Sequence, residues 1–195
     1  ASWHRGGHAV PVAVNLSAGT VHDPSLLDLV MSSVNANGLP PSAIELEITE
    51  SAVMRDPKGA LRSLEALTSR GVRFSLDDFG TGYSSLGYLQ RLPVASVKID
   101  KTFVMPLGKS DDLVASAIVR AVVELGHSLN LEVIAEGVES SSVLGAVAAL
   151  GCDALQGFYV AMPMEAQRLQ RWMAEHNPAA FTRQAGIGQP QGERR

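Results

Sequence analysis

The sequence predicts a parallel α/β protein of the (β/α)8 TIM-barrel type, with about six of the eight β/α units present in this chain. Short apolar runs alternate six times with longer segments of helical periodicity, which is typical of a parallel sheet covered by helices. Each run also carries a polar residue near its C-terminal end, namely Asn15, Glu47, Asp77 with Asp78, Lys98, Glu136 and Gln156. In a barrel these ends converge on one mouth, whereas an open doubly wound sheet would gather only those near its switch point.

The predicted strands are apolar runs at residues 10–15, 44–47, 72–77, 94–98, 131–136 and 154–158. Because side chains two positions apart share a strand face, polar residues are also expected inside the barrel, below the strand ends. Glu45 and Arg73 are the first candidate ion pair there.

The predicted helices lie between these strands and have recognisable starts and stops. The N-caps are Asp23 and Asp56, each followed by proline, and Ser110. A further helix is expected at residues 140–150, and the stops are Gly38, Gly71 and Gly151. A short helical turn leads towards residue 89, and the last helix is expected at residues 164–176. We therefore expect one domain over residues 1–176, followed by a flexible tail of Pro, Gly, Gln and Arg residues at 177–195.

Composition limits the function classes. The net charge of −4 and pI near 5.7 argue against a nucleic-acid polymer as the main partner. The single cysteine, Cys152, excludes an intrachain disulfide and a thiolate-rich metal site, and its apolar neighbours predict a small buried core residue. No signal peptide or run of 18 uncharged apolar residues is present, so we expect a cytoplasmic segment without membrane contact. The first residue is not Met, and the opening resembles the end of a helix, so we expect the chain to be cut from a longer protein, which other domains could anchor to a membrane.

The centre of the predicted site is the stretch Phe74-Ser-Leu-Asp77-Asp78-Phe-Gly-Thr-Gly-Tyr-Ser-Ser-Leu86, where an apolar run ends in two carboxylates and a glycine loop. Carboxylate and amide oxygens around one mouth suit Mg²⁺ or Mn²⁺, and two such cations sharing a carboxylate can clamp a phosphodiester. Asp77 is the natural bridging ligand, with Asp78 facing the second cation. The residues alone leave two questions open. The aspartates could have no metal-binding role, with Asp78 capping the helix after the loop and Asp77 in contact with solvent. Lys98 either acts on an attacking water or only neutralises the charge of the acids.

Other enzyme classes fit less well. Asp-Phe-Gly occurs in the kinase metal loop, but no other kinase motif is present. The Gly80-x-Gly82 loop is a poor dinucleotide fingerprint. A barrel enzyme that abstracts a proton next to a carboxylate is the serious rival, although its metal ligands would normally lie on three consecutive strands.

Several motifs together resemble those of the EAL-domain family of bacterial cyclic-di-GMP phosphodiesterases. They are Val14-Asn-Leu-Ser17, Glu47-Ile-Thr-Glu50-Ser51, the stretch 77–86, Val97-Lys-Ile-Asp100, Ile134-Ala-Glu136-Gly-Val-Glu139 and Gln156-Gly157, in the family's order and spacing up to about Pro163. The resemblance implies hydrolysis of cyclic di-GMP to linear pGpG with two Mg²⁺ or Mn²⁺ ions.

The resemblance also implies a role for each matched residue. Asn15, Glu47 and Asp77 are expected to bind the first metal, and Asp77, Asp78 and Glu136 the second. Lys98 and Glu136 are the expected catalytic residues, and Gln156 and Asp78 the expected substrate contacts. Gly80, Thr81 and Gly82 belong to the expected mobile loop, with Glu139 as its anchor. The resemblance further implies a homodimer through this loop and the adjacent helix, and fused sensory or diguanylate-cyclase (GGDEF) domains in the parent protein.

The sequence departs from the family pattern at its start, where the Glu-Ala-Leu motif and a following substrate-binding arginine are expected but not found. The missing glutamate is a first-metal ligand in the family, so weak or no hydrolysis is expected from this chain alone. A catalytically degenerate EAL module, acting as a cyclic di-GMP receptor or protein-interaction domain, is therefore the alternative hypothesis. Phe158, where the family commonly has Tyr, is a lesser departure.

Overall fold

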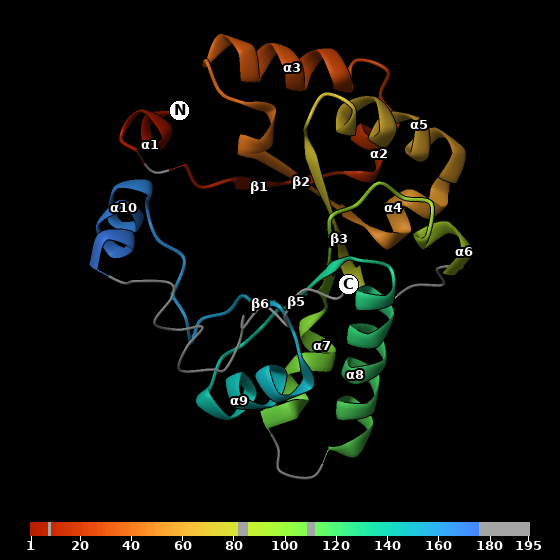
Figure 1. Ribbon diagram of the computed structural model, residues 1–195, viewed down its shortest axis with the longest axis vertical. Helices are drawn as coiled ribbons and strands as arrows, with labels where there is room; N and C mark the ends of the chain where they lie inside the picture. Colours follow the sequence, from red (N-terminus) through yellow and green to blue (C-terminus); the bar gives the residue numbers. More distant parts are fainter. Residues whose placement is uncertain (8, 82–85, 109–111, 176–195) are drawn as a thin grey trace, which may run out of the picture. The chain divides into compact units, whose positions relative to one another are not determined.

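The computed structural model of the protein describes residues 1–7, 9–81, 86–108 and 112–175 (Figure 1). Within these ranges six strands form one sheet, and their order in the sheet follows the chain from β1 to β6. The register is parallel between β1 and β2, between β2 and β3, and between β5 and β6. Helices lie between successive strands in the chain, so the predicted α/β class is confirmed.

Every predicted strand is present in part. The strands are β1 (Val12–Leu16), β2 (Ile44–Thr49), β3 (Arg73–Phe79), β4 (Ser96–Ile99), β5 (Glu132–Ala135) and β6 (Ala154–Leu155). Strands β2 and β3 both run two residues beyond their predicted ends, because the ladder continues to Thr49 opposite Asp77 and buried Ile48 and Phe79 anchor the extension. A polar residue near the end of an apolar run therefore did not mark where these two strands stop.

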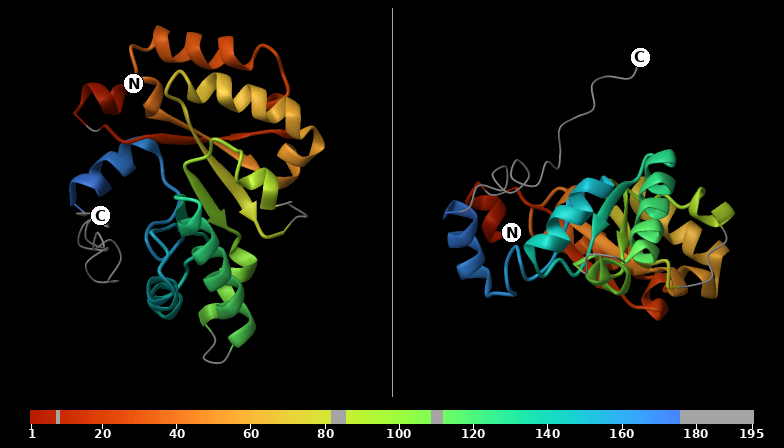
Figure 2. Two further views of the ribbon diagram at one scale, coloured as in Figure 1. Left: turned by 45° about the vertical axis from the view of Figure 1, so that its right-hand side comes forward. Right: turned by 90° about the horizontal axis from the view of Figure 1, so that it is seen from below.

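The chain divides into two compact units. The first comprises Ala1–Lys98 with Leu129–Leu131, and the second comprises Ile99–Ser128 with the residues from Glu132 onward. The helices of the first unit are α1 (Ser2–Arg5), α2 (Ala18–Val21), α3 (Leu26–Ala36), η1 (Pro41–Ala43), α4 (Glu50–Arg55), α5 (Pro57–Thr68) and α6 (Leu86–Leu89). Helices α3 and α5 lie side by side in both Figures 1 and 2, and α5 contacts β3. Their buried leucines, such as Leu64 and Leu67, form a core with Phe74 of β3.

One of the two predicted Asp-Pro caps is confirmed and the other is wrong. Asp56 caps α5 by accepting a hydrogen bond from the Gly59 amide at 3.0 Å, with proline at the first helical position. Asp23 instead accepts hydrogen bonds from the amide and hydroxyl of Ser25, at 2.8 and 2.7 Å. This local turn occupies the Asp23 carboxylate, and it lowers the pKa of that group. Helix α3 therefore begins at Leu26, two residues after the predicted first helical position, Pro24.

The second unit contains α7 (Lys101–Val104), η2 (Met105–Gly108), α8 (Leu113–Ser128), α9 (Ser141–Leu150) and α10 (Ala166–Glu175). Helices α8 and α9 pack on each other and on η2. The helix expected at residues 140–150 is α9, and Ser140 is its N-cap, accepting a 3.3 Å hydrogen bond from the Val143 amide. Gly151 ends α9 with a left-handed φ of 88°, a conformation that glycine adopts without strain.

Three other predictions concern the second unit. Cys152 is buried as expected, and burial together with the charge of Asp153 raises the pKa of its thiol to about 12. The last helix begins at Ala166, two residues after its predicted start. Ser110, His176 and the predicted tail at 177–195 lie outside the described residues. No helix in the described ranges is both long and apolar enough to cross a membrane.

Candidate functional site

Four of the predicted site residues lie at the C-terminal ends of strands in the first unit. Asn15 on β1 is the direct register partner of Glu47 on β2, so their backbones are adjacent. Asp77 on β3 pairs with Thr49, two residues beyond Glu47, and Lys98 lies in β4. Parallel strands therefore bring residues separated by more than 80 positions in sequence to one edge of the sheet.

The Lys98 side chain holds this group together. Its Nζ lies 2.8 Å from Glu47 Oε1 and 3.5 Å from Asp77 Oδ1. The lysine side chain is 5% exposed and the two carboxylates are 12% and 15% exposed, so the three charges are largely removed from water. One ammonium shared by two carboxylates leaves the group with a net negative charge, which attracts further cations.

The structure decides one part of the alternative interpretation of the two adjacent aspartates. Asp77 is not solvated, since it contacts Lys98, and its Oδ1 also accepts a hydrogen bond from the Asp78 amide at 3.0 Å. Asp78 lies inside β3, and its predicted alternative role as a cap of the helix after the loop concerns residues 82–85, which lie outside the described residues. Its φ of 54° is left-handed, a conformation that aspartate tolerates better than most residues. The extended alternation of β3 therefore breaks at the second acid.

The glycine loop begins with contacts inside the first unit. The Gly80 amide donates a hydrogen bond to Glu50 Oε2 at 3.4 Å, and the Thr81 hydroxyl donates to the Asp78 carbonyl at 2.8 Å. Glu50 is 2% exposed, which is unusual for a carboxylate and indicates a specific role. The sequence alone assigned no role to Glu50, which lies three residues after Glu47. An acidic residue in the first turn of a helix is common and does not by itself indicate a functional site. Gly82 lies outside the described residues.

The remaining predicted residues, Glu136, Glu139 and Gln156, belong to the second unit. Glu136 follows β5 directly, and its amide donates to the Ile99 carbonyl at 3.2 Å. The main chains of Gln156 and Val138 are also joined, by a 3.1 Å hydrogen bond from the Val138 amide to the Gln156 carbonyl. The Gln156 and Glu139 residues are exposed, and the anchoring role of Glu139 stays a prediction.

The glycine after Gln156 is a close-packing position. A Cβ atom placed on Gly157 would lie 2.1 Å from the Val138 carbonyl oxygen and 2.4 Å from its nitrogen. No side chain fits there, so the segments that carry Glu136 and Gln156 touch through their backbones. The chain turns at this contact, and β6 ends at Leu155 rather than at the predicted residue 158.

Asp100, two residues after Lys98, has a structural role. Asp100 caps α7 by accepting hydrogen bonds from the amide and hydroxyl of Thr102. Burial would raise the pKa of Asp100, but these hydrogen bonds, the Lys101 amide and the Lys101 charge together lower the pKa below its ordinary value.

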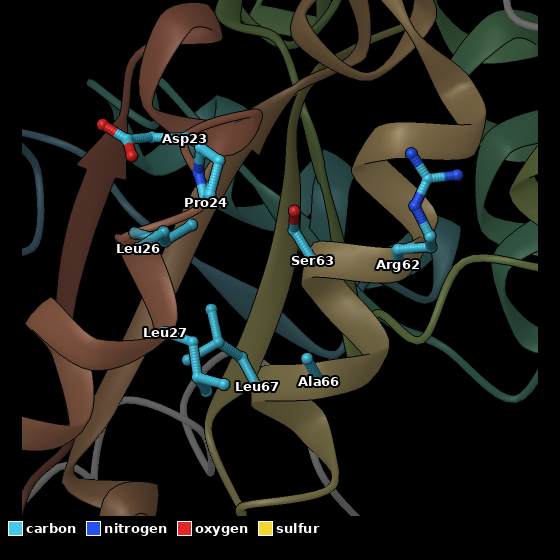
Figure 3. A pocket seen from close by; sticks show the side chains of 8 residues that line it. All are labelled: Asp23, Pro24, Leu26, Leu27, Arg62, Ser63, Ala66 and Leu67. Atoms are coloured by element: carbon cyan, nitrogen blue, oxygen red, sulfur yellow. The ribbon is translucent and has the colours of Figure 1, made fainter.

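The structure also has a hollow of about 200 Å³ away from these residues, between the turn before α3 and helix α5. Figure 3 shows its wall of Pro24, Leu26 and Leu27 on one side and Ser63, Ala66 and Leu67 on the other. None of the predicted site residues lines it.

The donor set of the first unit fits an oxygen-ligated divalent cation. Glu47 and Asp77 supply carboxylate oxygens and Asn15 an amide oxygen, the ligand types that Mg²⁺ and Mn²⁺ prefer. Over the described ranges, no three Asp, Glu, His or Cys side chains are close enough to form a metal cluster by themselves. The fit therefore depends on Asn15 and on the carboxylates that Lys98 now engages.

The protein is therefore a parallel α/β protein with a lysine and two carboxylates at its strand ends. Comparisons with known proteins identify its family. Residues 1–163 match the family model described as "EAL domain". The chain is 47% identical over 168 residues to the bifunctional diguanylate cyclase/cyclic di-GMP phosphodiesterase MucR of Pseudomonas aeruginosa, covering 86% of this chain and 24% of that protein. The chain thus spans about a quarter of that relative's length.

Solved structures give the same result. The structure entitled PaMucR phosphodiesterase, c-di-GMP complex, is 47% identical with a TM-score of 0.82, covering 86% of this chain and 68% of that one. A calcium/cy-diGMP complex of Klebsiella pneumoniae BlrP1 is 31% identical with a TM-score of 0.70, covering 80% and 40% of the two chains. The chain belongs to the EAL domain family, and the predicted barrel-type fold with six of its units in this chain is confirmed.

Proposed function

We propose that this chain is part of a cytoplasmic phosphodiesterase domain that hydrolyses one phosphodiester of cyclic di-GMP to give linear pGpG. The observation that carries the proposal is the buried Lys98 ammonium, 2.8 Å from Glu47 and 3.5 Å from Asp77 at adjoining strand ends. The similar structures of the MucR phosphodiesterase and of BlrP1 are complexes with this nucleotide, which supports the choice of substrate.

Each site residue has a proposed task. Asn15, Glu47 and Asp77 would hold one Mg²⁺ or Mn²⁺ ion, and Asp77, Asp78 and Glu136 are the proposed ligands of a second. Two such ions would supply an activated water and stabilise the leaving oxygen of the phosphodiester.

The chain's own residues position the reactants around these ions. Lys98, already oriented by Glu47 and Asp77, presents its ammonium to the attacking water and to charge that develops on the phosphate. Glu136 is the candidate proton acceptor, and Gln156 and Asp78 contact the substrate. Hydrogen bonds from the glycine loop to the Asp78 carbonyl and to Glu50 keep the backbone around the second acid in place.

The loop that starts at Gly80 also has proposed partners. Glu139 is its proposed anchor, and the loop with its adjacent helix is the proposed homodimer surface. The parent protein is proposed to carry further domains of the sensory or diguanylate-cyclase type, because the MucR relative is bifunctional and about four times as long as the matched region.

The test is to incubate the purified chain with cyclic di-GMP and Mn²⁺ and to resolve the nucleotides by chromatography. We expect pGpG from the wild type, at a low rate, and none from Asp77→Ala. Asp28→Ala is the matched control, because Asp28 is an exposed aspartate on α3 and its loss should not change the rate. Equal turnover by Asp77→Ala and the wild type would refute the proposed site.

One observation favours a second candidate, an EAL module that binds cyclic di-GMP or a protein partner without hydrolysing the nucleotide. In the described part of the chain, Lys98 engages two carboxylates and no three-residue acidic metal cluster is formed. A binding titration with cyclic di-GMP on the same sample separates the two functions. Saturable binding without product supports the second candidate, and product formation excludes it.

A further inference from the structure

A second layer of polar side chains lies beneath the acidic group of the first unit. Ser75 and Ser96 precede Asp77 and Lys98 by two residues on the same strands, and side chains two apart share a face. Both serines are buried, with 0% and 1% exposure. The Ser96 hydroxyl donates to Glu45 Oε1 at 3.4 Å, so polar groups continue below the site into the interior.

Ser75 differs from Ser96 in its hydrogen bonding. Within the described residues its Oγ has no protein hydrogen-bond partner, although the atom is fully buried. Native proteins nearly always satisfy a buried hydroxyl, either with another protein group or with an ordered water. The surroundings of Ser75 therefore indicate what satisfies it.

The strand register identifies those surroundings. Ser75 is the direct partner of Glu47 on β2, and adjacent strands lie about 4.8 Å apart. On the other side, the Ala95 amide donates to the Phe74 carbonyl at 2.8 Å, so the segment just before β4 adjoins β3 at this level. Ser75 thus lies beside a residue with a carboxylate side chain, which is beyond direct hydrogen-bond range of its hydroxyl.

The Glu47 carboxylate can accept a further hydrogen bond and so help to satisfy the Ser75 hydroxyl. Its Oε1 accepts from Lys98 at 2.8 Å, and a carboxylate offers about four acceptor sites in total. A water molecule needs two to four polar partners and bridges groups that are too far apart to bond directly. The Ser75 hydroxyl and the Glu47 carboxylate provide two such partners.

We propose that Ser75 is a positioning residue for Glu47, and that one buried water molecule between Ser75 Oγ and the Glu47 carboxylate transmits its effect. The water fixes the carboxylate from below while Lys98 holds it from the side. A fixed carboxylate keeps its oxygens in place for the cation, and this last consequence depends on the function proposed above.

A double-mutant cycle on thermal unfolding tests the link without any ligand. Ser75→Ala should lower the melting temperature by about 2–4 °C, the shift expected for one lost hydrogen bond in a domain of this size. Ser75→Cys, which keeps the side-chain shape but bonds weakly, should show most of the same loss. In a Glu47→Met background, where the acceptor is absent, Ser75→Ala should change the melting temperature by less than about 1 °C.

Two outcomes of this cycle would overturn the proposal. An unchanged or higher melting temperature for Ser75→Ala would mean that the hydroxyl is simply unsatisfied, because removing such a group relieves its desolvation cost. An equal loss in both backgrounds would mean that Ser75 acts by packing and independently of Glu47.

Mn²⁺ binding, measured by electron paramagnetic resonance with the metal alone, tests the positioning role. We expect Ser75→Ala to weaken Mn²⁺ binding about 10-fold, the typical effect of losing an outer-shell partner. Ser63→Ala on α5 is the control, because it removes a serine hydroxyl outside the site, bonded to the Gly59 carbonyl, and should leave the affinity unchanged. Wild-type affinity in Ser75→Ala would refute the positioning role. If the wild type binds no Mn²⁺, the proposed function fails, and the thermal cycle still decides the Ser75–Glu47 link.

A crystal structure of the chain tests the water itself. Density for a water within hydrogen-bond distance of both Ser75 Oγ and a Glu47 oxygen would support the proposal. A dry site, or a direct Ser75–Glu47 hydrogen bond, would overturn it.

Discussion

Replacing Lys98 by Met should destabilise the protein, and divalent cations should partly reverse the loss. The substitution preserves the length of the buried side chain but removes the ammonium that lies 2.8 Å from Glu47 and 3.5 Å from Asp77. Removing one partner of a fully buried ion pair costs about 3–5 kcal/mol, because the other charge stays behind in a poorly solvated place. Since the two carboxylates are still 12% and 15% exposed, we expect a smaller loss of about 2–3 kcal/mol in the free energy of unfolding.

Urea unfolding in metal-free buffer measures this loss. With a denaturant slope of about 2 kcal/mol/M, the midpoint should fall by about 1–1.5 M. Lys58→Met is the matched control, because Lys58 is an exposed lysine on α5 and its loss should change stability by less than about 0.5 kcal/mol. Adding Mn²⁺ should then raise the midpoint of Lys98→Met more than that of the wild type, because a cation binds unpaired carboxylates without competing with an ammonium.

Two results would refute this reasoning. If Lys98→Met unfolds at the wild-type midpoint, the carboxylates do not depend on the ammonium for their stability. If Mn²⁺ raises both midpoints equally, Lys98 and the cation do not share the same oxygens.

Three further predictions concern other positions. Glu50→Ala removes the acceptor of the hydrogen bond from the Gly80 amide. Because this bond is long, at 3.4 Å, we expect hydrogen exchange of the Gly80 amide to become only about 5-fold faster. An unchanged exchange rate would show that the bond does not protect the loop. Gly157→Ala should lower the free energy of unfolding by more than about 2 kcal/mol in calorimetry or denaturation, because the new methyl group would overlap backbone atoms 2.1 Å away. Gly145→Ala on α9 is the control, since it has open space and should stabilise the protein by up to about 1 kcal/mol. Similar effects at the two sites would contradict the close approach at Gly157. The Cys152 thiol, with its pKa raised to about 12, should not react with a thiol reagent at pH 8 until the protein is unfolded, and rapid labelling of the native protein would contradict its burial.

Much of the fold could be predicted from local patterns. The alternation of apolar runs and helical segments identified all six strands, and Asp56 was recognised as a cap because capping depends on residues within one turn. Asp23 was not predicted correctly, since the same Asp-Pro signal also begins a turn, and the nearby Ser25 hydroxyl and amide captured its carboxylate first. The short helix α4 directly after β2 was also not predicted, because six residues are too few to show a helical period.

The sequence by itself determined the family, the parallel α/β class and the identity of the polar residues at the strand ends. These follow from residue types at fixed spacings, which the chain carries without folding. Only the tertiary structure decided which of those residues meet. The contact of Lys98 with Glu47 and Asp77, the bond from Gly80 to Glu50 and the place of Ser75 beside Glu47 each join residues about 20–50 positions apart. Such contacts depend on strand register and on side-chain burial, and a shift of one residue in register would turn each side chain to the other face of the sheet.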